Sequence, residues 1–83
     1  MEMIIIEVTL PAAGKSFEIR LPRAMNCLTA AHLTAEALAP LSGGTYLPSR
    51  GSFFAWKDSG KLLNMGRSLF QEKVQNGSRL LLI

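Results

Sequence analysis

The apolar and polar positions at the start of the chain predict a β-hairpin. Residues Met3 to Leu10 are mostly apolar and predict a strand, and PAAGK at 11 to 15 predicts a turn because it contains Pro and Gly. Residues Ser16 to Leu21 alternate between polar and apolar, which is typical of a strand with one buried face. Pro22 ends this second strand.

An amphipathic helix is expected next. Asn26 is of a type that caps helix N-termini and Pro40 blocks continuation, so we expect a helix through about Ala39. At about 100° per residue its smaller apolar residues gather on one arc. They are Cys27, Ala30, Ala31, Ala35 and Leu38. Because most of these side chains are short, we expect the helix backbone to pack close against a sheet.

The second half of the chain predicts shorter elements. In chain order they are a Gly-, Pro- and Ser-rich loop at 41–52, a strand at 53–57, a short strand at 61–64 that pairs back on it, a helical turn at 68–70 and a final strand at 79–83. Leu69 or Phe70 is expected to point inward and anchor the connector before the final strand. Alternation along the third strand favours Phe54 and Trp56 inward, with Phe53 and Lys57 outward.

Length and composition predict one globular domain spanning 1–83. The chain has 83 residues, of which 48% are hydrophobic and 18% charged. The apolar run near the N-terminus is short, is interrupted by Glu7 and has no cleavage site after it, so we expect a cytoplasmic protein without membrane insertion. A single Cys and a single His can form neither an internal disulfide nor a structural zinc site. We therefore expect no metal and no cofactor.

Several local patterns resemble catalytic motifs, but each has a structural explanation. The GKS at 14–16 matches the end of a phosphate-binding loop, yet Thr9 stands where that motif needs Gly, and a strand follows where it needs a helix. Cys27 and His32 lie about 140° apart on the predicted helix, so they do not face each other. Cys27 is interpreted as a core residue, and His32 as an ion-pair partner of Glu36. We expect no catalytic residues and no enzymatic activity.

The net charge of +3 and the aromatic residues of the third strand raise the question of nucleic-acid binding. The basic residues are scattered along the chain, and acidic residues lie between them, so no basic stripe is predicted. Nucleic acid is therefore disfavoured as a partner.

The order of elements resembles the β-grasp, or ubiquitin-like, fold. That fold implies an α+β domain with a mixed sheet of four to five strands packed on one main helix. The resemblance is carried by GKSFEIRLP, GKLLNMGRSL and VQNGSRLLLI. The chain is further similar to the YukD/EsaB ubiquitin-like proteins of bacterial type VII (WXG100) secretion systems, through EIRLP, LPSRGSFFAW and NGSRLLLI. This resemblance implies an accessory or regulatory component that contacts the membrane subunit or the FtsK/SpoIIIE-type ATPase.

The end of the chain bears on conjugation. Ubiquitin and the sulfur carriers of this fold act through a Gly-Gly tail beyond the last strand, whereas this sequence ends at Ile83 with no glycine after the strand. Conjugation and sulfur carriage are therefore disfavoured, and a sulfur carrier or protein modifier would need residues beyond Ile83.

The outward face of the predicted sheet is the candidate site for a protein partner. In the β-grasp fold the first and last strands are central neighbours and the third lies beside the last. One exposed apolar patch with a charged border is then expected on that face. The apolar members are Ile5, Phe53, Leu81 and Ile83, and the charged members include Arg20, Lys57 and Arg79.

Other functions remain open from the sequence. A ubiquitin-like small subunit of a multicomponent enzyme, such as an aromatic monooxygenase, would also lack the Gly-Gly tail. A nucleic-acid-binding β-grasp domain would show binding that falls steeply with salt. A homo-oligomer is compatible with each of these functions, because the same patch can pair with itself about a two-fold axis. The second strand is expected at a sheet edge, where it can accept a partner strand, although polar outward residues are typical of protected edges.

Overall fold

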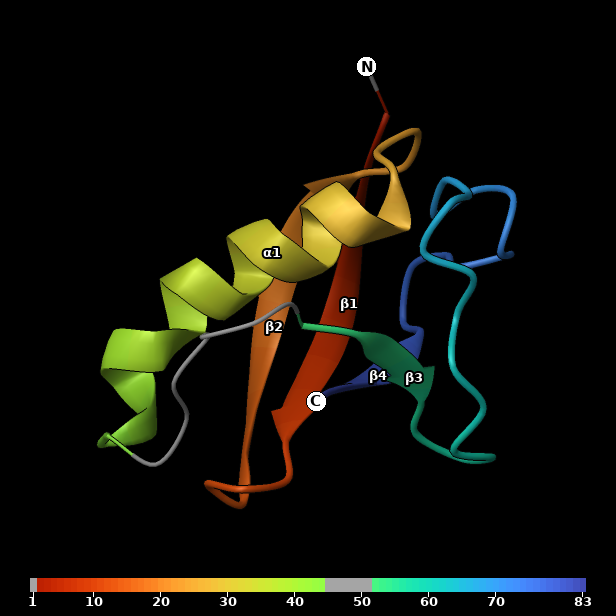
Figure 1. The fold of residues 1–83 in the computed structure, drawn as a ribbon. Helices are drawn as coiled ribbons and strands as arrows, with labels where there is room; N and C mark the ends of the chain where they lie inside the picture. The colour runs from red at the N-terminus through yellow and green to blue at the C-terminus, as the bar shows by residue number, and fades with distance from the viewer. Residues whose placement is uncertain (1, 45–51) are drawn as a thin grey trace.

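The computed structural model describes residues 2–44 and 52–83, and it shows one helix packed across one face of a four-stranded sheet (Figure 1). The strands are β1 (Met3–Leu10), β2 (Lys15–Pro22), β3 (Phe54–Trp56) and β4 (Arg79–Leu82), in the spatial order β2-β1-β4-β3. β1 runs antiparallel to β2 and parallel to β4, and β3 runs antiparallel to β4. The predicted central pair of first and last strands is confirmed.

The predicted hairpin is formed by β1 and β2. Gly14 makes the turn possible, because its φ of +64° lies in the left-handed region and its N–H donates to the Leu10 carbonyl at 2.9 Å. The register places Ile6 opposite Ile19. Alternate residues of β1 then face the helix, and they are almost fully buried. These residues are Ile4, Ile6, Val8 and Leu10.

Helix α1 (Cys27–Leu38) begins and faces the sheet as predicted. The Asn26 side chain accepts a hydrogen bond from the Leu28 N–H at 2.9 Å, which satisfies one of the free donors of the first turn. All five arc residues named above are buried, and Thr34 is buried with them. After Leu38 the chain tightens into the 3₁₀ helix η1 (Ala39–Ser42), which accommodates Pro40 near its start. The rest of the loop expected at 41–52 lies mostly outside the described residues.

The third strand is shorter than predicted, but its side chains face as expected. Phe54 is fully buried, Trp56 packs partly against the core, and Phe53 is exposed. The expected short strand at 61–64 is reduced to a single bridge between Ala55 and Leu62, because the chain then turns away toward the start of α1. The sheet therefore has four strands.

The connector between β3 and β4 contains one turn where a helical turn was expected. The Glu72 N–H donates to the Ser68 carbonyl at 3.0 Å, and the turn is not continued. Lys73 ends the turn with a φ of +66°, which is unusual for a residue with a side chain. Of the two anchor candidates, Leu69 is fully buried and Phe70 is 55% exposed. Leu69 is the anchor.

Candidate interaction surface

The outward face of the sheet carries three well-exposed apolar residues from the predicted patch. Ile5 is 42% exposed, Phe53 44% and Ile83 51%, whereas Leu81 is half-buried. Their inward neighbours Ile4, Phe54 and Leu82 are buried, so strand alternation directs the exposed side chains away from α1.

Phe53 and Ile83 form a direct cross-strand pair. Each donates its backbone N–H to the carbonyl of the other, at 2.8 and 2.9 Å. The next outward pair is Ala55 opposite Leu81. Cross-strand partners on one face lie about 5 Å apart, so Phe53, Ile83 and the half-buried Leu81 form a contiguous apolar surface, the β3–β4 patch (Phe53, Leu81, Ile83). Ala55 lies beside these residues but is only 1% exposed.

Ile5 does not join that surface, which corrects the prediction of a single four-residue patch. The parallel register places Glu7 beside Arg79, and the Gly77 N–H donates to the Ile5 carbonyl. Ile5 is therefore level with Gly77, which lies just before β4 and six positions before Ile83, or roughly 20 Å at the rise of a strand. The sequence shows which face each residue occupies, but only the register shows its position along that face.

A charged row separates Ile5 from the β3–β4 patch. The row crosses the whole sheet through Glu18, Glu7, Arg79 and Lys57. The Lys57 ammonium lies 3.2 Å from a Glu7 carboxylate oxygen, and the Arg79 guanidinium lies 3.0 Å from Asp58. Lys57 and Arg79 therefore border the patch as predicted. Arg20 lies beside Ile5, on the far side of the row.

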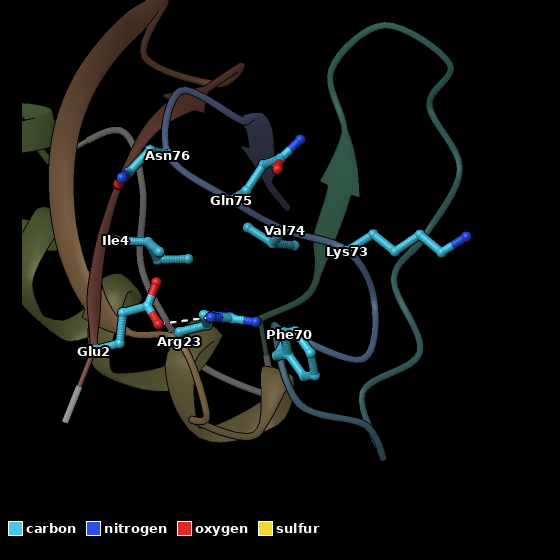
Figure 2. A pocket seen from close by; sticks show the side chains of 8 residues that line it. All are labelled: Glu2, Ile4, Arg23, Phe70, Lys73, Val74, Gln75 and Asn76. Carbon is cyan, nitrogen blue, oxygen red and sulfur yellow. Dashed lines mark hydrogen bonds and ion pairs between the residues drawn. The ribbon is translucent and has the colours of Figure 1, made fainter.

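A second surface feature was not predicted. A cavity of about 600 Å³ lies beside the start of β1, where the connector passes it (Figure 2). The Arg23 guanidinium stacks 3.9 Å from the centre of the Phe70 ring and lies 2.6 Å from a Glu2 carboxylate oxygen. Phe70 and Arg23 lie far apart in the sequence, so no local pattern could indicate their contact. This contact holds the connector, through Phe70, against the end of the hairpin next to Arg23.

Cys27 is a core residue, as predicted. It is fully buried, and its N–H donates to the Arg67 carbonyl at 2.8 Å. The pKa of its thiol is raised to about 11, mainly by burial and also by the charge of Glu72, while the charge of Arg67 partly opposes the rise. At neutral pH the side chain is therefore a neutral thiol, which is a poor nucleophile.

His32 and Glu36 lie 3.3 Å apart on the exposed side of α1, as predicted. Nowhere in the part of the chain that the structure describes do three His, Cys, Asp or Glu side chains gather as metal ligands. Across residues 2–44 and 52–83, no helix has the length and apolar character needed to cross a membrane.

Comparison with known proteins identifies the fold. No family model matches the chain, and no curated protein does. In structure it is similar to the ubiquitin-like domain of the Mycobacterium tuberculosis type VII secretion protein EccD1, with a TM-score of 0.79 and 22% identity, covering 100% of this chain and 99% of that one. It is also similar to the ubiquitin-like domain of Plasmodium falciparum Dsk2, with a TM-score of 0.74 and 21% identity over 98% and 96% of the two chains.

A third similar structure is a chain of the MycP5-free ESX-5 inner membrane complex. The TM-score is 0.81 at 17% identity, and the match covers 100% of this chain and 21% of that one. At such identities the likeness shows the fold alone. The chain has the ubiquitin-like β-grasp fold, as the sequence predicted.

Proposed function

We propose that this chain is a non-enzymatic, cytoplasmic interaction module of a type VII secretion system, related to the YukD/EsaB proteins. The observation that carries the proposal is its likeness to the ubiquitin-like domain of EccD1, a type VII secretion protein, over nearly the full length of both chains. The match to about a fifth of a chain in the ESX-5 inner membrane complex supports it, because it concerns a domain of the same size within a secretion assembly.

The β3–β4 patch is the surface proposed to bind the partner. Contiguous apolar surface with a charged border is typical of protein interfaces. Phe53 and Ile83 supply the exposed apolar side chains, and the paired Lys57 and Arg79 supply the border. The proposed partners are the membrane subunit or the FtsK/SpoIIIE-type ATPase of the secretion system.

The test is a quantitative capture of these two proteins by the tagged chain after co-expression. The Phe53→Asp, Ile83→Asp double variant should reduce retention of the secretion partner by roughly tenfold or more, because it places charge at both exposed anchors. A Leu28→Asp, Leu41→Asp double variant is the matched control: its two residues are 52% and 54% exposed and belong to α1 and η1.

The control variant should retain the partner like wild type, and circular dichroism should show both variants folded. Equal retention by all three forms would exclude the β3–β4 patch. Failure of wild type to retain either secretion protein would contradict the proposed function, as would specific capture of a multicomponent oxygenase in their place.

A further inference from the structure

Strand β2 is an open edge of the sheet. Among the described residues it pairs with β1 alone (Figure 1). Glu7 of β1 donates its N–H to the Ser78 carbonyl, so the odd-numbered residues of β1 direct their backbone groups away from β2. The even-numbered residues of β1 therefore form the backbone hydrogen bonds to β2. Because Ile6 lies opposite Ile19, their partners in β2 are the odd-numbered residues. The backbone groups of Ser16, Glu18 and Arg20 are left facing the open edge.

The side chains along this edge are self-complementary. The sequence Phe17-Glu18-Ile19-Arg20-Leu21 reads apolar, acidic, apolar, basic, apolar, and in the reverse direction the acidic and basic residues exchange places. If a second copy aligns antiparallel about a two-fold axis through Ile19, Glu18 lies opposite Arg20 of that copy, and Arg20 opposite its Glu18. Ile19 then meets its own counterpart, and Phe17 meets Leu21. Opposite charges placed directly across a strand pair stabilise the pairing.

Neighbouring registers are disfavoured by the same charges. Moving the axis to Glu18 places that residue opposite its own copy, and moving it to Arg20 places two arginines together. With the axis through Ile19, Glu18 of one copy lies opposite Arg20 of the other, and the backbone groups of both residues face the open edge. Each such pair can therefore form two main-chain hydrogen bonds. One register therefore satisfies the backbone and the charges together.

Two further features distinguish this edge from the rest of the sheet. Within residues 2–44 and 52–83, neither Glu18 nor Arg20 takes part in an ion pair, whereas Glu7, Lys57 and Arg79 each have a partner. Phe17 and Ile19 pack against the core from the helix side but remain only half-buried. A second strand beside β2 would cover them and give the two charges partners.

We infer that this protein forms a homodimer through antiparallel pairing of β2 with β2 of a second copy. The two four-stranded sheets then join into one, with both outward faces on the same side. Two β3–β4 patches are presented together, which increases avidity for a partner with repeated sites. The dimer does not depend on the proposed secretion function. Because strand pairing at one edge buries a small area, the dimer is expected to depend on protein concentration.

The experiment is sedimentation velocity on the full chain over roughly two decades of concentration. Wild type should shift from monomer to dimer. Glu18→Arg and Arg20→Glu should each weaken dimerisation by roughly tenfold or more, because each sets like charges across both symmetric pairs. An equimolar mixture of the two variants should restore a heterodimer, and the double exchange Glu18→Arg, Arg20→Glu should restore the homodimer.

The same set of variants includes a control for correct folding. Glu18 faces Glu7 across the hairpin, so Glu18→Arg removes a like-charge pair and should leave the monomer at least as stable by thermal unfolding. A monomeric wild type at every concentration would overturn the dimer. A dimer unaffected by the single variants, or a mixture that stays monomeric, would overturn the β2 register. Neither result bears on the capture experiment, because that experiment tests the β3–β4 patch and not the β2 edge.

Discussion

The β1–β2–α1 half and the connector between β3 and β4 are held together in different ways. In the first, period-two burial in the strands and one buried helix face produce a continuous core. In the described connector, from Lys57 to Ser78, few residues are buried and no named strand or helix forms. The buried apolar residues there are Leu63, Leu69 and Val74.

The difference lies in how the backbone groups are satisfied. The hairpin and helix use regular ladders, whereas the connector combines irregular backbone hydrogen bonds with hydrogen bonds to side chains. The Asn64 N–H donates to Glu72 at 2.8 Å, and Ser68 and Gln71 each donate a backbone N–H to the side chain of the other at 3.0 Å. An irregular segment can thus be ordered by a few apolar anchors and local polar bonds. Because the two regions are ordered differently, substitutions in each should have separable effects on stability.

The largest effect is expected from truncating a buried anchor in each region. Ile6→Ala should lower the free energy of unfolding by about 3 to 4 kcal/mol, because Ile6 is 1% exposed in the main core. Leu69→Ala should cost about 2 to 3 kcal/mol and mainly speed amide exchange in the connector. Urea unfolding and hydrogen exchange measure both. Uniform loss of protection in Leu69→Ala would show that the regions unfold as one.

Cys27 joins the two regions, and its thiol gives a pH test of that junction. The pKa is about 11 in the folded chain against a reference of 9.0, so the unfolded chain releases its proton first as pH rises. The free energy of unfolding should therefore fall between these two pH values, by about 3 kcal/mol in all, and be unaffected by this group below pH 9. Urea unfolding of Cys27→Ala should lack this fall. The same slope in both proteins would show that other groups cause it.

Substitutions at Thr34 test whether an unsatisfied polar group lowers the stability of the β1–β2–α1 half. Its hydroxyl is buried and has no hydrogen-bond partner among the described residues. Thr34→Val keeps the shape and removes the unsatisfied group, so we expect stability to rise by about 1 kcal/mol. Thr34→Ser keeps the hydroxyl and should give no gain. A loss of stability in Thr34→Val would mean that the hydroxyl is satisfied in solution.

The smallest effect is expected at Lys73, in the connector. Its φ of +66° is unfavourable for a side chain but not for glycine. Lys73→Gly should raise the free energy of unfolding by about 0.5 kcal/mol, with the relieved strain partly offset by backbone entropy. Lys73→Ala removes the same charge and keeps the strain, so it should give no increase. Equal values for the two variants in thermal unfolding would exclude backbone strain as the cause.

Sequence reasoning was strongest where a local period or a local bond decides the structure. The hairpin, the Asn26 cap and the buried arc of α1 all depend on residues within a few positions of one another. It was weaker in the connector. There Leu69 could not be chosen over Phe70, because the choice depends on contacts with Met25 and Arg23 far away in the chain.

The sequence by itself determined the fold class and the face of the sheet on which each candidate residue lies, because alternation along a strand is local. Only the tertiary structure decided the neighbours on that face. The side chain of Asn76 accepts the Ile5 N–H at 2.8 Å, and Gly77 donates to the Ile5 carbonyl, so Ile5 is held level with the start of the last strand. That register separates Ile5 from Phe53 and Ile83. It arises from contacts between the two ends of the chain, which no local pattern encodes.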